Sequence, residues 1–350
     1  MLQTELTNWR TAGSVGNWGS LTVDGSITQG SDALFTDIVV SGNYVLVAGD
    51  DSSGGAGLYV YDISNTASPT RVNTLFNLGH GALALALRGK TLYVLTDDPS
   101  NEIKVYSVTG LPSLSYRTSY NLPGSARGTS IANYGAMLYA GTVYGSGGGD
   151  KEFFAFDIAN SGSIVLKSSF DGNDGYNTIA LSGTSAYLAT GDDAYELTVM
   201  NVENSGSLVY ATGQGYNLSG TQNGLAAAIS GTSAILGRER GTSIQEFILF
   251  KIPNGGVPST PGPYYHEMSG SVLDLAVDTS GCYAFAATQQ KWKALQVINI
   301  NSTSLPEKTS YTLGSGQGRS VFYDMTRDRL FFATDTALYI FRPGASTGSC

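Results

Sequence analysis

Several polar residues of this sequence could form a ligand site if loops from distant parts of the chain converge. Arg127, in Ser-Ala-Arg-Gly, and Arg319, in Gln-Gly-Arg-Ser, occupy matching places. Two guanidinium groups at one opening would bind a carboxylate or sulfate through paired hydrogen bonds. Alternatively, the arginines neutralise nearby aspartates and tie the fold together. Comparable loops carry the other ligand-binding candidates, His80, Asp174 and Asn223.

Trp292 is a ligand-binding candidate of a different kind, because it lies between Lys291 and Lys293 in an expected loop. An exposed indole between two lysines would suit contact with a sugar or a protein.

Acidic pairs recur in the expected loops, for example Asp50-Asp51 and Asp97-Asp98. They predict a rim that binds a cation or a basic partner, or they are ordinary solvated turns, which favour Asp and Gly. The segment 171–175, DGNDG, superficially resembles the start of a calcium loop, but it lacks the DxDxDG spacing and the distal Glu of an EF-hand. We expect no cofactor, with Ca²⁺ as the alternative and with Asp171, Asn173, Asp50 and Asp51 as its candidate ligands.

Catalytic motifs are sparse. The only histidines, His80 and His266, have no nucleophile motif beside them, and neither G-x-S-x-G nor H-E-x-x-H occurs. We therefore expect a protein that is not an enzyme, with no catalytic residues. A carboxylate-pair glycosidase stays open as an alternative, because sequence cannot supply the distance between two acids.

The two cysteines, Cys282 and Cys350, are too few and too far apart for a zinc site. Cys282 opens an expected strand, where a buried thiol is one interpretation. The other is a disulfide between Cys282 and Cys350, which would fit an oxidising compartment.

The composition bounds the class of protein. Charged residues make up 13% of the 350 residues and the net charge is −9, which argues against a nucleic-acid partner. No apolar run is long enough to span a bilayer. The 45 glycines suit tight turns in an all-β, exported protein. The first residues, MLQTELTNWRT, lack signal-peptide features, and the composition favours a trimmed exported chain over a cytosolic one.

The elements that must position these loops come from a sevenfold repeat. GLYVYDIS, at 57–64, is echoed by EIKVYSVT (102), EFFAFDIA (152), ELTVMNVE (196), EFILFKIP (246), ALQVININ (294) and ALYIFRPG (337), which start 43 to 50 residues apart. A period of this size indicates a propeller, a solenoid or another array. Each unit reads as four strands, so we predict an all-β, seven-bladed β-propeller. In that order, the loops after the second and fourth strands share one face.

Ring closure follows from the ends of the repeat. The segment 20–30, SLTVDGSITQG, resembles the closing piece of the later units, whereas the last unit ends near Gly344 without one. The N-terminal strand is therefore expected to complete the last blade, which removes the exposed sheet edges of an open array. The expected domains are an arm or linker at 1–18, the propeller at 19–344 and a tail at 345–350.

The stretch 41–72, SGNYVLVAGDDSSGGAGLYVYDISNTASPTRV, resembles the LVIVD-type repeat, as does SGTSAYLATGDDAYELTVMNVE. The resemblance covers about residues 20–344, and it is looser in units five to seven. It implies a seven-bladed propeller in a secreted or surface-tethered bacterial or archaeal protein. The family has no shared catalytic residues, so the resemblance implies none here.

We expect an extracellular or cell-surface binding or adhesion module whose partner is a protein or a glycan. The first alternative is a subunit of a filament or surface layer that binds copies of itself. The second is an extracellular glycan hydrolase or lyase that uses rim carboxylates.

Overall fold

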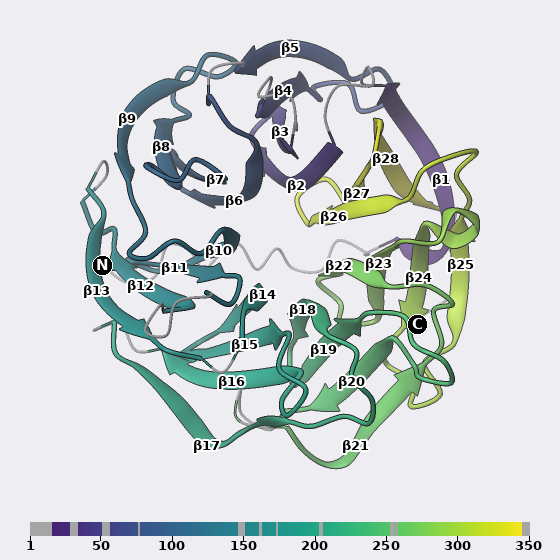
Figure 1. Ribbon diagram of the computed structural model, residues 1–350. Helices are drawn as coiled ribbons and strands as arrows, with labels where there is room; N and C mark the ends of the chain where they lie inside the picture. The colour runs from purple at the N-terminus through teal and green to yellow at the C-terminus, as the bar shows by residue number, and fades with distance from the viewer. Residues whose placement is uncertain are drawn as a thin grey trace.

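The computed structural model describes residues 16–28, 34–50, 57–75, 78–145, 151–160, 163–172, 174–202, 206–252, 256 and 258–344. Its strands form seven four-stranded antiparallel sheets, arranged as blades around a central axis (Figure 1). The seven-bladed β-propeller predicted from the repeat is confirmed.

The strands follow the chain from the axis outward in each blade. Blade 1 contains β2 (Leu34–Ser41), β3 (Tyr44–Asp50), β4 (Leu58–Asp62) and β5 (Thr70–Leu75); blade 2 contains β6 (Ala82–Arg88), β7 (Thr91–Thr96), β8 (Ile103–Ser107) and β9 (Ser115–Tyr120); blade 3 contains β10 (Gly128–Tyr134), β11 (Met137–Thr142), β12 (Phe153–Asp157) and β13 (Val165–Phe170). Blade 4 contains β14 (Tyr176–Ser182), β15 (Ser185–Thr190), β16 (Leu197–Val202) and β17 (Leu208–Tyr216); blade 5 contains β18 (Gly224–Ser230), β19 (Ser233–Arg238), β20 (Phe247–Lys251) and β21 (Ser259–His266). Blade 6 contains β22 (Val272–Val277), β23 (Tyr283–Thr288), the 3₁₀ turn η2 (Lys291–Lys293), β24 (Leu295–Asn299) and β25 (Glu307–Tyr311); blade 7 contains β26 (Gly318–Asp324), β27 (Arg329–Thr334), β28 (Ala337–Gly344) and β1 (Asn17–Thr28).

Blade 7 closes the ring as the sequence predicts. Strand β1 pairs antiparallel with β28 at the outer edge of the blade, with Val23 opposite Phe341, and Figure 1 shows these first and last strands of the chain next to each other. The strand begins at Asn17, so the ring extends two residues into the expected arm at 1–18. Trp18 is fully buried, and its indole N–H donates to Asp328 Oδ1 at 3.1 Å. Residues 1–15 and the expected tail at 345–350 lie outside the described residues.

The hydrophobic core lies between the blades. Seven clusters of buried side chains each combine residues of two neighbouring blades. In the cluster at the seam, Trp18 meets Phe285 of blade 6 edge-on, with the ring centroids 5.0 Å apart. Each blade therefore buries both faces against its neighbours, which explains the nearly continuous apolar strands in the repeat.

The inner strands share a β-bulge near their first residue, where the register slips by one. A bulge re-aims consecutive side chains. Thr36 Oγ1 therefore reaches the Ala82 carbonyl of the next blade at 2.8 Å, and Asn177 Nδ2 reaches the Gly224 carbonyl at 2.7 Å. The bulges thus direct side chains from one inner strand to the next around the axis.

Candidate functional site

The predicted ligand residues belong to one face of the ring. The loops from the second to the third strand of each blade, and from the fourth strand to the next blade, share this side, here called the mouth face. Acidic residues mark its loops in blades 1 to 4, as the sequence indicates.

Arg127, on the loop between β9 and β10, is paired with Asp50 at the end of β3, with 2.9 Å between Nη2 and Oδ2. The pair joins blade 3 to blade 1 across the start of blade 2. Gly81 leaves room for this crossing, because a Cβ there would collide with Asp50 Oδ1. Half of the Arg127 side chain, 51%, is exposed. This contact agrees with the interpretation that the arginine ties blades together.

Arg319 is paired within its own blade. Its Nε lies 2.6 Å from Asp335 Oδ1, in the turn between β27 and β28, and the Gln317 backbone N–H donates to the other carboxylate oxygen at 3.2 Å. The two arginines therefore bind different aspartates, and the structure gives no contact that joins them.

His80 lies against the acidic loop of blade 2. Its Nδ1 is 3.6 Å from Asp97 Oδ1, and its Nε2 is 3.9 Å from Asp98 Oδ1. Lys104 Nζ is 2.9 Å from Asp98 Oδ2 and also bonds the Leu78 carbonyl. Burial alone would raise the pKa of Asp98, but the hydrogen bonds from Lys104 and the Ser100 amide outweigh it and the pKa is lowered.

The remaining ligand candidates on the mouth face also have partners. Asp174 accepts from the Gly175 N–H at 2.6 Å, and the backbone of Asn223 exchanges hydrogen bonds with Glu239. Asp171 is paired with Lys151 at 2.7 Å.

The calcium prediction therefore concerns Asp171 and Asp50, both ion-paired, together with Asn173 and Asp51, which lie outside the described residues. The described residues contain no group of three or more His, Cys, Asp and Glu side chains placed to hold a metal ion.

Cys282 is disulfide-bonded, so the interpretation as a buried free thiol is wrong. The only other cysteine in the chain, Cys350, lies outside the described residues. The pairing of Cys282 with Cys350 stays a prediction.

Four buried glutamates hold the loops of the mouth face in place. Each precedes the third strand of its blade and accepts a backbone N–H from the segment after the fourth strand, at 2.8 or 2.9 Å: Glu102 from Leu122, Glu152 from Gly172, Glu196 from Leu218 and Glu246 from Met268. Burial raises the pKa of all four, although these hydrogen bonds oppose the shift. Each glutamate therefore pins the loop that leaves its blade.

Arg238 is buried beside one of these glutamates. Its Nη2 lies 3.3 Å from Glu196 Oε1, the two side chains are 2% and 1% exposed, and Nη2 also donates to the Ser219 carbonyl at 3.1 Å. Although it ends strand β19 next to a mouth-face loop, Arg238 lies inside the fold between blades 4 and 5.

Blade 6 has Ala294 where blades 2 to 5 have the glutamate. The equivalent N–H, of Leu313, instead donates to the Lys291 carbonyl at 2.8 Å, and Thr312 Oγ1 donates to the Trp292 carbonyl at 2.6 Å. With these hydrogen bonds, the loop forms the 3₁₀ turn η2. The Trp292 side chain points into solvent, and the residue is 61% exposed.

The same turn orders the side chains around the indole. Lys291 Nζ lies 4.5 Å from the centroid of the Trp292 ring, which is within cation–π range. Lys293 is paired with Glu307 at 2.6 Å. Trp292 is therefore a large, exposed aromatic residue on a turn fixed by hydrogen bonds. Tryptophan is among the residue types that contribute most to binding energy at interfaces.

Two aspartates of the inner strands face a different environment. Asp37, after the bulge of β2, accepts from the backbone N–H groups of Ile38 and of Leu85 in the next blade, both at 2.7 Å. Asp274, at the matching place in β22, accepts from Ser320 Oγ and from the Val321 N–H at 2.7 and 2.8 Å.

Both aspartates have strongly raised pKa values. Burial raises the pKa of Asp37 to about 7, with repulsion from Asp274 adding to it, against the two backbone hydrogen bonds. Burial raises the pKa of Asp274 to about 6, against its bonds from blade 7. These two carboxylates are therefore acceptors that link inner strands near the axis.

The comparison with known families concerns blade 1. Residues 35–75, from Phe35 in β2 to Leu75 at the end of β5, match the family model of the LVIVD repeat. Blade 1 is therefore similar to an LVIVD repeat. No curated protein matches the chain at the sequence level.

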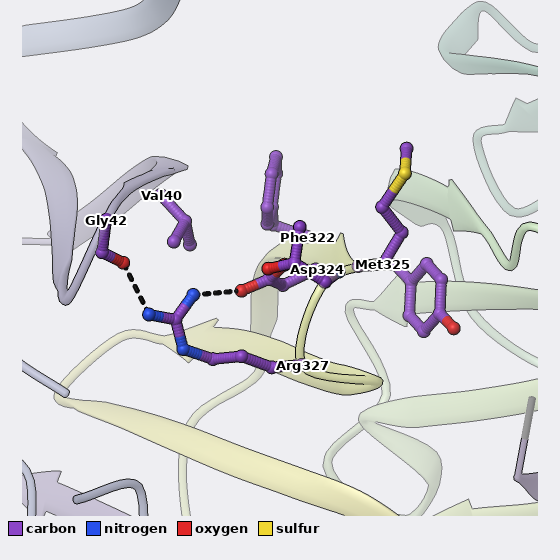
Figure 2. A pocket seen from close by; sticks show the side chains of 8 residues that line it. Val40, Gly42, Phe322, Asp324, Met325 and Arg327 are labelled. Atoms are coloured by element: carbon purple, nitrogen blue, oxygen red, sulfur yellow. Dashed lines mark hydrogen bonds and ion pairs between the residues drawn. The ribbon is translucent and has the colours of Figure 1, made fainter. Parts of the chain in front are cut away.

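One pocket lies on the opposite face, beside blade 1. It is lined by Val40 and Gly42 of blade 1 and by residues 322–327 of blade 7. Figure 2 shows Arg327 spanning the two blades, with hydrogen bonds to Asp324 Oδ2 at 2.7 Å and to the Gly42 carbonyl at 2.6 Å. Met325, beside it, is 60% exposed. Sequence reasoning gave this side of the ring no role.

A repeat-by-repeat comparison could have found the roles of two groups, the anchoring glutamates and the inner-strand aspartates. The anchoring Glu starts four of the seven copies of the repeat, and an Asp follows the bulge position in two inner strands. Both signals become visible only when the seven units are aligned position by position.

Proposed function

We propose that this protein is a non-enzymatic binding module outside the cell, and that the η2 loop of blade 6 is its principal contact. The observation that carries the proposal is the exposed indole of Trp292 on a loop held by two hydrogen bonds from the chain after β25. Such a side chain contributes binding energy at low entropic cost, because its position is set before the partner arrives. The expected partner is a protein or a glycan.

The other residues on the mouth face support a scaffold role for the ring. Arg127, Arg319, His80 and Asp171 each have a charged partner, so their side chains stabilise loops. The disulfide at Cys282 fits an oxidising compartment and therefore an exported protein.

The test compares Trp292→Ala with Tyr116→Ala, a control that removes an aromatic of similar exposure, 58%, from the outer strand β9. Both variants and the wild type are applied to a glycan array and to a surface that carries immobilised wild-type protein. We expect retention of the wild type and of Tyr116→Ala on at least one probe, and a loss of roughly 30-fold for Trp292→Ala, the size of an interface hot spot.

Equal retention of both variants would contradict the proposal, and so would the absence of retention on every probe. Retention confined to the immobilised protein would favour the filament or surface-layer alternative, which analytical ultracentrifugation would then examine.

A further inference from the structure

We propose that blades 5 and 6 together form a binding surface for an acidic glycan, a polysaccharide that carries carboxylate or sulfate groups. The surface consists of Arg240, Gln289, Lys291 and Trp292, here called the blade 5–6 patch. The inference rests on the proposed function and names the class of its ligand.

The two loops that carry the patch are held together by one residue. Ser271, on the segment between β21 and β22, accepts the Arg240 backbone N–H with its Oγ at 3.0 Å and the Gln289 backbone N–H with its carbonyl at 2.9 Å. Immediately after Arg240, Gly241 pairs with Ile244 in an isolated bridge, which fixes that turn. The start of the blade 5 loop therefore lies beside the start of the η2 loop.

The patch has two exposed cations, Arg240 and Lys291, and neither lies within 4.0 Å of a carboxylate of the described residues. Both side chains are exposed. Within the described part of the chain, the one charged or aromatic contact of Lys291 is the cation–π contact with the Trp292 ring. Glu239, Glu267 and Glu307, on segments around the patch, have other contacts; Glu307 is paired with Lys293. Glu239 turns to the Asn223 N–H at 3.4 Å, and Glu267 lies close enough to Glu246 to raise its pKa.

The rest of the mouth face limits an anionic ligand to this patch. The loops of blades 1 to 4 present aspartates such as Asp50 and Asp98, and the whole chain carries a net charge of −9. A polyanion is therefore repelled by most of the protein, and any retention must come from a local contact. Long-range electrostatic attraction between the polyanion and the whole acidic chain cannot produce this retention.

The chemistry of the patch favours a glycan over an acidic peptide. The indole offers a flat apolar surface of the size of a sugar ring, against which the C–H edges of a pyranose pack. The Gln289 amide both donates and accepts hydrogen bonds, which suits hydroxyl groups. The flanking guanidinium and ammonium groups suit carboxylate or sulfate groups along the same polymer.

The experiment measures retention of the wild type on immobilised polygalacturonate, heparin, neutral dextran and poly-glutamate. We expect retention on polygalacturonate or heparin, weaker retention on poly-glutamate and none on dextran. Retention should disappear at 1 M NaCl, where the screening length falls to about 3 Å. The double variant R240A/K291A should bind about tenfold more weakly, because two exposed charged contacts are removed.

The matched control is R117A/K308A, which removes one arginine and one lysine from the exposed outer strands β9 and β25 and should bind as the wild type does. An equal loss in both double variants would overturn the proposal, because the effect would follow total charge. If the wild type were retained on dextran regardless of salt, and Trp292→Ala abolished that retention, the ligand would not be an acidic glycan. The proposed function would then remain intact. Stronger retention on poly-glutamate would favour an acidic protein, and retention on none of the four probes would overturn the inference.

Discussion

The carboxylates at the mouth and those at the axis both lose hydration on folding, and they are compensated for that loss in different ways. At the mouth, Asp98 lies 2.9 Å from the ammonium of Lys104, and its pKa is lowered. At the axis, Asp37 receives only backbone N–H groups among its described hydrogen bonds, and its pKa rises to about 7. The residue type is the same, so the difference comes from the partner and from the burial.

The comparison shows what each region contributes. At the mouth, the ammonium of Lys104 compensates for the hydration that Asp98 loses, so the carboxylate keeps its charge while it positions the loop. A carboxylate near the axis links two inner strands, but it must lose its hydration or its charge to do so. Glu196 combines features of both regions, since its side chain is only 1% exposed and it still has a cation, Arg238.

The largest expected effect comes from removing that cation. Arg238→Ala leaves Glu196 buried without its partner, which should lower the free energy of unfolding by about 3–5 kcal/mol. The loss should be greater at pH 8 than at pH 5, because the isolated glutamate can become neutral in the acidic sample. Urea denaturation at the two pH values measures both quantities.

Glu102→Gln is the control for this experiment. Glu102 holds its loop through the Leu122 N–H, and the described ion pairs give it no cation. A glutamine keeps an acceptor at that position, so this variant should lose about 1 kcal/mol or less. If Arg238→Ala changed stability no more than Glu102→Gln, the cation would contribute nothing beyond packing.

The second prediction concerns pH. The folded-state pKa values of Asp37 and Asp274, about 7 and about 6, lie above the ordinary value of 3.8. Above pH 7 the folded protein holds both charges at a penalty. As pH falls through 7 toward 4 the folded state takes up protons first and gains stability. From pH 8 to pH 5 the free energy of unfolding should therefore rise by roughly 2–4 kcal/mol.

Asp37→Asn sharpens this prediction because it removes one of the two titrating groups. The rise between pH 8 and pH 5 should shrink by roughly two thirds, because Asp37 gains about two pH units of protonation in this range and Asp274 about one, at about 1.4 kcal/mol per unit. Asp98→Asn should leave the rise unchanged, because the pKa of Asp98 is already lowered and it titrates below this range. An unaltered rise in Asp37→Asn would assign the pH dependence to other groups.

The architecture could be predicted from the sequence because it depends on periodicity. Seven apolar copies require seven sheets, and the segment at 20–30 has the pattern of a fourth strand that the last copy lacks. The shared face of the candidate loops follows from strand order alone.

The partners of the individual side chains could not be predicted, because they depend on how the blades are placed around the axis. Arg127 and Asp50 are 77 residues apart and belong to blades that are not neighbours in the chain. Asp37 lies in an apolar stretch, FTDIVV, where a pattern-based analysis expects a strand and assigns no charge a role. The exposed position of Trp292 depends on the absence of a glutamate at position 294, which has meaning only beside the other blades.

The smallest expected effect concerns the exposed pair at the mouth. Arg127→Ala should cost at most about 1 kcal/mol, and most of that cost should vanish in 1 M NaCl, because half of the arginine side chain is in water. A double-mutant cycle with Asp50→Asn isolates the coupling between the two side chains. A coupling above about 2 kcal/mol that survived high salt would mean that the mouth pair is desolvated like Arg238 and Glu196. The contrast between the mouth and the axis would then depend on the partner alone, and burial would no longer distinguish them.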